Sequence, residues 1–249
     1  MQQIPLIDSY TLRPNEVDVE HLLKLSSLAD MFQNSAWRSA ELLGFGYHAL
    51  VDQGLAWVLS RLHIKIHAYP AWGETIQVHT WPKRVDRLFA LRDFQVFSSN
   101  DISQPVIEAT SAWLLVDGKT KRPRKVESLE QPIPSHNVDA ITDTPSKIIL
   151  PDSYAHSLSF PVRRSNLDMN FHTNNACYIG WIEDSLPMEM YLKRRIHELR
   201  INFIGESFVG DILGVEYNLH DSAAGRMRNQ KDQEIIHFEA SLSSQHIKE

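Results

Sequence analysis

The sequence contains one cysteine, ten glycines and no long apolar run among its 249 residues. Its single cysteine, Cys177, cannot form an internal disulfide or a multi-cysteine zinc site, so we expect a reducing compartment. The longest apolar runs, such as residues 112–116, are far shorter than the ~18 residues that a membrane span needs. The first twelve residues lack the basic start and apolar stretch of a signal peptide. We therefore expect a cytoplasmic protein with no membrane span.

The low glycine content and the negative net charge argue against dinucleotide-binding and nucleic-acid-binding proteins. The one sequence that approaches a dinucleotide-binding fingerprint, residues 44–49, follows a helical pattern rather than a strand, which is typical of a helix end. The formal net charge of −6 disfavours nucleic-acid binding, and an acidic partner would need a local basic patch. His63 and His67 share one face of a strand-like segment but have no evident third ligand, so we expect no metal site.

Helical and strand-like patterns occur in two similar series. Residues 18–43 have apolar side chains spaced three to four apart, which predicts a long helix with one buried face. Period-two segments rich in aromatic and β-branched residues follow at 57–66, 75–81, 89–98 and 106–116. Residues 117–153 are polar and contain several prolines, as in a connector. The second series comprises a short strand at 157–163, a helix over 174–195 and strands at 198–204, 211–220 and 235–243.

The two series can be aligned with each other. Residues 32–37 parallel residues 172–177, with Asn34 over Asn174 at an offset of 140. Residues 73–78 parallel residues 210–215 at an offset of 137. Because the two offsets are nearly equal, we interpret the chain as a duplicated unit of one helix and one sheet.

The segment between Asn166 and Trp181 carries the most chemistry. Asp168, Asn170 and His172 alternate, so in an extended backbone their side chains leave the same face. Thr173 or Asn174 can then cap the second helix, whose N-terminal amides favour an oxygen with developing negative charge. A carboxylate, an amide, an imidazole and a helix N-terminus together suit attack on a carbonyl, although cap and turn chemistry alone is the structural alternative for the Asp and Asn residues.

At this segment the sequence resembles the plant and bacterial acyl-acyl-carrier-protein thioesterases, whose second half carries a motif close to Asp-x-Asn-x-His-x-Asn-Asn-x-x-Tyr-Ile-Gly-Trp. The resemblance extends from about residue 9 to residue 242. Further motifs of the first half of that family match residues 57–61, 80–81, 92–94, 109–113 and 117–122.

The resemblance implies an α+β tandem (double) hotdog, in which two long helices are each wrapped by an antiparallel sheet. We expect an N-terminal unit over residues 1–125 with the acyl-chain pocket, a connector over 126–153 and a catalytic unit over 154–249. The catalytic residues of the family correspond to Asp168, Asn170, His172 and Glu206. No cofactor is expected, because the substrate itself carries 4′-phosphopantetheine.

The implied activity is hydrolysis of a fatty acyl thioester in fatty acid biosynthesis. Glu206, helped by His172, would activate water or attack directly, Asn170 and helix-terminal amides would hold the thioester oxygen, and Asp168 would orient His172 or the water. The family often has a cysteine directly after the glutamate, where this sequence has Ser207. Cys177 is interpreted as a packing residue, and residues 205–209 fail as a Gly-x-Ser-x-Gly nucleophile elbow.

The implied partner is an acyl carrier protein, which is acidic in the families of this resemblance. Docking requires exposed basic residues, and the sequence offers three clusters: Lys119, Lys121, Arg122, Arg124 and Lys125; Arg163 and Arg164; and Lys193, Arg194 and Arg195. Each cluster could equally be a solvated connector or helix face. Because a duplicated chain already supplies the pairing of two hotdog units, a monomer suffices for a site, and a homodimer is the alternative.

Three other functions are compatible with the same fold. An acyl-coenzyme A thioesterase would accept coenzyme A esters equally well, and a hotdog dehydratase would hydrate its substrate instead of releasing free fatty acid. A non-catalytic acyl-binding module would bind without turnover, since fold alone does not fix function. The sequence leaves acyl chain length open.

Overall fold

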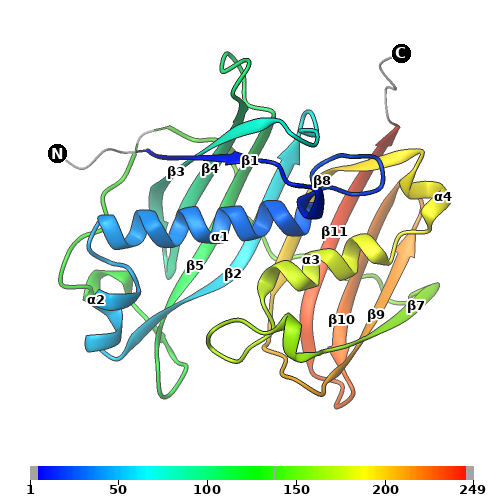
Figure 1. Ribbon diagram of the computed structural model, residues 1–249. Helices are drawn as coiled ribbons and strands as arrows, with labels where there is room; N and C mark the ends of the chain where they lie inside the picture. Colours follow the sequence, from blue (N-terminus) through cyan, green and yellow to red (C-terminus); the bar gives the residue numbers. More distant parts are fainter. Residues whose placement is uncertain (1–4, 137, 245–249) are drawn as a thin grey trace.

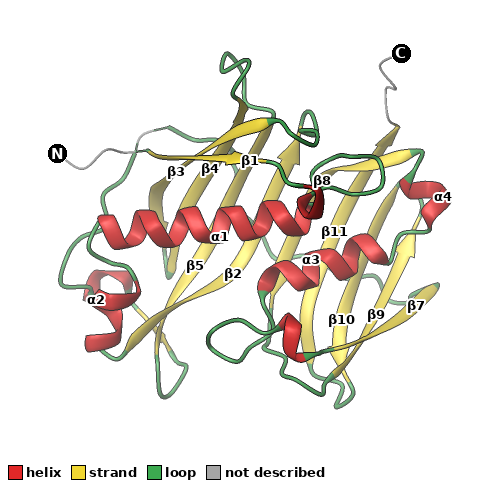
Figure 2. Ribbon diagram, in the orientation of Figure 1, coloured by secondary structure: helices red, strands yellow, loops and turns green. Residues whose placement is uncertain are grey.

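The computed structural model describes residues 5–136 and 138–244. The chain folds into two similar halves, each with its helices on one face of an antiparallel sheet (Figures 1 and 2). The first half contains β1 (Leu6–Thr11), α1 (Leu25–Leu42), α2 (Tyr47–Asp52), β2 (Leu55–Ile66), β3 (Thr75–Asp86), β4 (Phe89–Ser98), β5 (Ile107–Asp117) and β6 (Pro123–Arg124). The second contains β7 (His156–Pro161), α3 (Asn175–Asp184), α4 (Met188–Tyr191), β8 (Arg194–Phe203), β9 (Ile212–Leu219), β10 (Ser222–Asn229) and β11 (Glu234–Ser244). Short 3-10 turns lie at Pro14–Glu16, Val126–Ser128 and Arg164–Asn166.

The strands of the described residues form one sheet in the order β1-β3-β4-β5-β2-β8-β11-β10-β9-β7, with β6 paired to β5. The order within the first half is the reverse of that within the second. The halves join where β2 and β8 pair antiparallel, from Arg61 opposite Asn202 to Lys65 opposite Glu198. This arrangement has an approximate two-fold axis between β2 and β8, and it confirms the expected α+β double hotdog.

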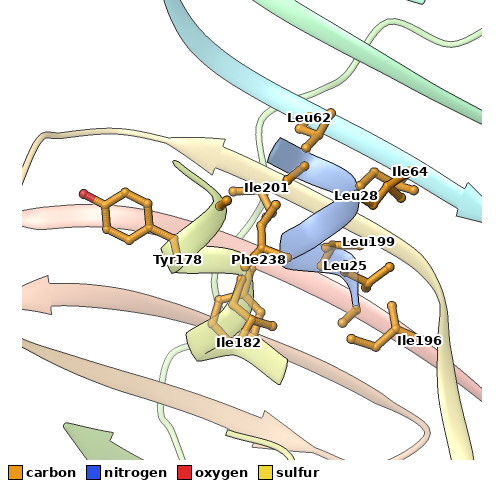
Figure 3. Close-up of a cluster of buried hydrophobic side chains, with 14 of the residues drawn as sticks. Leu25, Leu28, Leu62, Ile64, Tyr178, Ile182, Ile196, Leu199, Ile201 and Phe238 are labelled. Carbon is orange, nitrogen blue, oxygen red and sulfur yellow. The ribbon is translucent and has the colours of Figure 1, made fainter. Parts of the chain in front are cut away.

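The hydrophobic core lies where the two helices cross the central strands. Alternation along β2 and β8 directs one set of apolar side chains toward the helices, and Figure 3 shows this set against α1 and α3: Leu62, Ile64, Leu199 and Ile201 from the strands, Leu25 and Leu28 from α1, and Tyr178 and Ile182 from α3. Each of these side chains is 5% exposed or less. Because fully burying one such aliphatic side chain stabilises a fold by roughly 1.5–3 kcal/mol, the shared core holds the two halves together.

The fold confirms the predicted duplication, but one of the two sequence alignments is wrong. The strand alignment holds, since β3 begins at Thr75 and β9 at Ile212, an offset of 137. The helix alignment fails, since α1 begins at Leu25 and α3 at Asn175, an offset of 150. Asn174 therefore corresponds to Lys24 rather than to Asn34. Most of the change in offset arises because α1 has 18 residues and α3 only 10.

Two element boundaries differ from the sequence prediction for local reasons. The first helix was expected from residue 18, but residues 18–24 form a loop and α1 begins at Leu25. The second helix was expected to residue 195, but α3 ends at Asp184. Pro187 follows three residues later, and a proline cannot continue the hydrogen-bond ladder of a helix. The remaining residues form α4 and the start of β8 instead.

The strand β10 was not expected, because its sequence is rich in small and charged residues. Its inward positions are Ala223, Gly225 and Met227, which alternate with Ala224 and the half-buried Arg226 and Arg228. A Cβ atom added at Gly225 would lie 2.3 Å from the carbonyl oxygen of Glu216, so this inward position accepts only glycine. The strand β1 and the helix α2 were not expected either.

The connector crosses the face of the sheet opposite the helices. Arg61 Nη1 donates to the carbonyl of Pro145 (2.7 Å), and Asn202 Nδ2 donates to the carbonyl of Ser146 (3.1 Å). Further along, the indole of Trp81 donates to the carbonyl of Val138 (2.9 Å). The connector is therefore attached to both halves and leaves the helical face of the sheet open.

No helix within residues 5–136 and 138–244 has the length and apolarity needed to cross a bilayer.

Candidate active site

The loop between Leu167 and Thr173 is shaped by the carboxylate of Asp168. Asp168 Oδ1 accepts the N–H groups of Asn170 (2.8 Å) and His172 (3.1 Å), while the N–H of Asp168 donates to the carbonyl of His172 (2.8 Å). Phe171 takes a left-handed backbone conformation with φ of 63° so that the loop can close. Asp168 thus acts on His172 through the backbone rather than through the imidazole ring.

The first half contains the same loop without the same chemistry. Asp18 Oδ1 accepts the N–H groups of Glu20 (2.8 Å) and Leu22 (3.1 Å), and His21 has a φ of 60°. At the offset of 150, Asp18 corresponds to Asp168 and Glu20 to Asn170. In the same way His21 corresponds to Phe171 and Leu22 to His172. The loop conformation is therefore a property of the duplicated fold, whereas the amide of Asn170 and the imidazole of His172 belong to the second half alone.

His172 lies next to Glu206, which comes from the loop between β8 and β9. His172 Nδ1 is 3.5 Å from Glu206 Oε1, and the two side chains are 27% and 41% exposed. The imidazole packs edge-on against the ring of Phe208 at 5.3 Å. On the other side of the loop, Asn170 Nδ2 lies 3.5 Å from Asp168 Oδ2. The structure therefore places all four expected residues on two adjacent loops, with an imidazole and a carboxylate in contact and reachable by solvent.

The two loops are joined through Ser207. The N–H and the hydroxyl of Thr173 both donate to the carbonyl of Ser207 (3.0 Å each), and the Ser207 hydroxyl contacts those of Thr173 (2.7 Å) and Tyr178 (2.8 Å). Ser207 is 0% exposed. A hydroxyl so enclosed has no access to a substrate, so Ser207 fixes Glu206 relative to His172 and is not a nucleophile.

Cys177 lies in the first turn of α3 and packs against the hydrophobic core. Its thiol contacts the carbonyl and side-chain amide of Asn166 at 3.6 and 3.7 Å. Burial raises the pKa of this thiol, which disfavours the reactive thiolate. These contacts support the interpretation of Cys177 as a packing residue.

The N-terminus of α3 follows the catalytic loop directly and is attached to α1. Asn174 Oδ1 caps α3 by accepting the N–H of Ala176 (3.1 Å), and it also accepts Gln33 Nε2 (3.0 Å). Asn174 Nδ2 donates to Asp30 (2.9 Å), and Asn175 Nδ2 donates to Gln33 Oε1 (3.2 Å). The first half thus holds the start of the catalytic helix through two side chains, Asp30 and Gln33, that sequence reasoning missed.

A narrow apolar cleft with a cavity volume of about 20 Å³ lies between the helices and the sheet and reaches the first residue of α3. It is lined by Ala29, Phe32, Gln33, Leu59, Leu62, Phe94, Ser111, Trp113, Asn175, Ile179 and Phe203. Eight of these eleven residues belong to the first half. Within the cleft, the indole of Trp113 donates to the hydroxyl of Ser111 (2.8 Å), which fixes the ring. The cleft has the apolar lining that a hydrocarbon chain requires.

Two of the three basic clusters are exposed. Residues 119–125 are exposed in the turn after β5 and in β6, and β5 carries Trp113. Arg163 and Arg164 are exposed at the 3-10 turn just before the catalytic loop. The prediction for the third cluster, residues 193–195, was wrong in part. Arg195 is only 6% exposed and forms an ion pair with Asp18 in the first half. Arg195 therefore joins the halves and is not part of a docking surface.

The residues described by the structure contain no group of three or more His, Cys, Asp and Glu side chains arranged for a metal ion. His63 Nε2 instead contacts Glu198 (2.7 Å), and His67 Nε2 contacts Glu108 (3.1 Å).

Two family models match the chain, one in each half. The acyl-ACP thioesterase N-terminal domain matches residues 6–129, and the acyl-ACP thioesterase C-terminal domain matches residues 151–248.

Two plant relatives are also named as acyl carrier protein thioesterases. Oleoyl-acyl carrier protein thioesterase 1, chloroplastic, from Arabidopsis thaliana is 26% identical over 225 residues, which are 83% of this chain and 61% of the relative. Palmitoyl-acyl carrier protein thioesterase, chloroplastic, from Gossypium hirsutum is 28% identical over 208 residues, which are 78% of this chain and 50% of the relative. The match thus spans only about half to three-fifths of the length of these relatives.

Solved structures agree over nearly the full length. An acyl-ACP thioesterase from Bacteroides thetaiotaomicron superposes with a TM-score of 0.83 at 25% identity and covers 95% of this chain and 97% of its own. The 12:0-ACP thioesterase from Umbellularia californica superposes with a TM-score of 0.85 at 19% identity, covering 98% and 99%. Because the identity to the Umbellularia californica protein is only 19%, its similarity supports the fold alone.

Proposed function

Because the chain belongs to the acyl-ACP thioesterase family, we propose that it hydrolyses the thioester of a fatty acyl-acyl carrier protein to free fatty acid and holo-acyl carrier protein. The observation that carries the proposal is the contact of His172 with Glu206 (3.5 Å) beside the N-terminus of α3, to which the apolar cleft extends. A carbonyl held there would have its hydrocarbon chain in the cleft and its sulfur toward solvent.

In the proposed reaction, water adds to the thioester carbonyl. Glu206, held by His172, accepts a proton from the water as the new C–O bond forms. When the C–S bond breaks, the proton passes to the departing thiolate of the pantetheine arm. A group with 41% of its side chain exposed can reach such a water molecule.

The oxygen of the thioester needs hydrogen-bond donors as it gains negative charge. The proposed donors are the amide of Asn170 and the N–H of Asn175, the first residue of α3, which has no acceptor among the residues that the structure describes. The first N–H groups of a helix have no partner within the helix, and the helix dipole adds a partial positive charge there. Asp168 supports both donors indirectly, since its carboxylate fixes the loop that precedes them.

We assign the acyl chain to the apolar cleft and therefore the choice of substrate mainly to the unit at residues 1–125, with the catalytic groups in the unit at residues 154–249. Phe32, Phe94 and Trp113 are the large cleft residues of the first unit. Burial of a chain methylene contributes about 0.8 kcal/mol, so the depth of the cleft determines which chain length binds best.

We propose that the acidic carrier protein docks on the exposed basic residues beside the site. Arg163 and Arg164 precede Asp168 by only a few residues, and residues 119–125 follow β5, which carries the cleft residue Trp113, and fold back onto it. Local positive charge allows a chain of net charge −6 to attract an acidic partner. The proposed enzyme needs no cofactor of its own, because the 4′-phosphopantetheine arrives with the substrate.

One assay tests this function against its alternatives. The protein is incubated with acyl carrier protein esters and coenzyme A esters of graded chain length, and free thiol and free acid are measured. Release of both products from the carrier esters supports the proposal. Equal turnover of coenzyme A esters would identify an acyl-coenzyme A thioesterase, and tight binding without thiol release would identify an acyl-binding module.

The proposed enzyme acts in the cytoplasm, where a single unpaired cysteine stays reduced. Its site is complete within one chain, so a monomer suffices for activity. Size-exclusion chromatography with light scattering distinguishes a monomer from a homodimer.

A further inference from the structure

Gln33 and Glu183 occupy equivalent positions in the two halves. At the offset of 150 that relates the helix starts, Gln33 of α1 corresponds to Glu183 of α3, and each is the ninth residue of its helix. Each side chain reaches across to the N-terminus of the other helix. The two side chains differ only in their terminal group, which is a neutral amide in Gln33 and a carboxyl group in Glu183.

Glu183 caps α1 through backbone amides. Its two carboxyl oxygens accept the N–H groups of Leu25 (3.2 Å) and Ser26 (3.4 Å), the first two residues of α1. The preceding Lys24 provides no side-chain cap. A carboxylate here satisfies amides that have no partner within the helix and complements the helix dipole. In the first half, the N-terminal amides are therefore already occupied.

Gln33 contacts side chains at the start of α3 and not the backbone. It donates to Asn174 Oδ1 (3.0 Å) and accepts from Asn175 Nδ2 (3.2 Å). The cap of α3 comes from Asn174 itself. Within the described residues, the N–H of Asn175 has no hydrogen-bond acceptor. Gln33 therefore leaves the backbone N–H of Asn175 without a hydrogen bond, at the first residue of α3 and three residues after His172.

We infer that Gln33 is a positioning residue of the active site. Its neutral amide fixes Asn174 and Asn175 and leaves the Asn175 N–H for the thioester oxygen. A carboxylate at the same position binds that N–H itself, as Glu183 does at the other helix, and competes with the substrate. The inference rests on the proposed thioester hydrolysis and adds a residue of the first half to its machinery.

The test compares Gln33→Glu with Gln33→Met, which have nearly the same size as glutamine. Loss of one oxyanion donor costs about 10²–10³-fold in kcat, so Gln33→Glu lowers kcat by at least about 100-fold with KM changed less than about threefold. Because a protonated carboxyl resembles the amide, the ratio of wild-type to variant kcat falls as pH is lowered. Gln33→Met loses only the bridge to Asn174 and Asn175, so its smaller deficit does not change with pH.

The matched control is Gln53→Glu, which adds the same charge at a glutamine that donates to the carbonyl of Ala49 (2.9 Å) in α2. It retains wild-type kcat. Thermal unfolding separates loss of function from loss of fold, and Gln33→Glu still unfolds in one cooperative transition above the assay temperature. A Gln33→Glu variant with wild-type kcat, or with the same pH-independent deficit as Gln33→Met, overturns the inference.

A second readout does not depend on activity. Amide hydrogen exchange of Asn175, followed by NMR, slows by at least about tenfold in Gln33→Glu if the new carboxylate accepts that N–H. Unchanged exchange overturns the capping argument even when kcat falls. If wild type hydrolyses no thioester at all, the proposed function fails, and the exchange result still decides whether residue 33 controls the amide.

Discussion

Removing the carboxylate of Glu206 is expected to abolish most of the activity without affecting the fold. Glu206 is 41% exposed, and its side chain makes one ion-pair contact, with His172 at 3.5 Å. An exposed pair of this kind contributes about 0–1 kcal/mol to stability, so Glu206→Gln changes the free energy of unfolding by less than about 1 kcal/mol. A general base contributes typically 10²–10⁴-fold to the rate, which corresponds to about 2.7–5.5 kcal/mol of barrier.

The assay is release of free thiol from an acyl carrier protein ester, with kcat and KM measured for wild type, Glu206→Gln and Glu239→Gln. Glu239 is a suitable control because its side chain is 38% exposed and has one distant ion-pair contact, 3.9 Å from Arg200. Glu206→Gln is expected to lose at least about 100-fold in kcat, whereas Glu239→Gln keeps the wild-type value. Near-normal turnover by Glu206→Gln would refute the assignment of Glu206. Single turnover in ¹⁸O-labelled water then tests direct attack. General-base action puts the label in the fatty acid, whereas an acyl-Glu206 anhydride that water opens at the Glu206 carbonyl puts the label in Glu206 and releases an unlabelled fatty acid.

Three further predictions concern stability, specificity and docking. Burial raises the pKa of Glu183 from 4.5 to about 7, because the hydrogen bonds from the Leu25 and Ser26 amides offset only part of the cost of burying its charge. Protonation of Glu183 therefore stabilises the fold by about 3 kcal/mol below about pH 4.5, and this contribution is lost as pH rises through 7. Chemical denaturation between pH 4.5 and 8 should show that slope in wild type and not in Glu183→Gln, and equal slopes would contradict the burial of this carboxyl. Trp113→Ala, which removes a fixed ring from the cleft, should move the best substrate toward longer chains in a chain-length series, and an unchanged preference would place the acyl chain elsewhere. For docking, Arg164→Ala should raise KM for the carrier ester several-fold at low salt and not at high salt, whereas a salt-independent KM in wild type would exclude electrostatic docking.

Sequence patterns predicted the parts of the fold that depend on burial. The apolar stripe of α1 was evident because the helix has one buried face. The strands β2–β5 were evident from their aromatic and β-branched residues, although residues 91–94 and 109–112 are buried on both faces of the sheet. The strand β10 gave no such signal, because its close approach to β9 requires Gly225 and because its arginines are paired with glutamates. The wrong helix alignment has a similar origin: the helices differ in length, so shared residue types such as Asn34 and Asn174 were matched instead of helix starts.

The candidate site was predictable only where its residues follow one another in the chain. The alternation of Asp168, Asn170 and His172 predicted one face of an extended segment, and this was wrong, because the segment folds into a turn closed by the carboxylate of Asp168. Glu206 came from the family resemblance. Gln33 and Asp30 lie more than 140 residues from the helix that they hold, and contacts across the two-fold axis leave no local pattern. Only the fold shows that Asp168 shapes the loop through backbone amides, since the matching loop at Asp18 makes the same hydrogen bonds.

The most direct test of the account is the turnover of fatty acyl-acyl carrier protein by the purified wild-type chain. Equimolar release of free thiol and free fatty acid is expected, with kcat/KM for the carrier ester at least about tenfold above that for the matching coenzyme A ester, because the carrier presents an extended acidic surface to the basic residues whereas coenzyme A presents only its phosphates. Saturable binding of the acyl carrier protein without thiol release, or equal kcat/KM for the two esters, would contradict the proposed function.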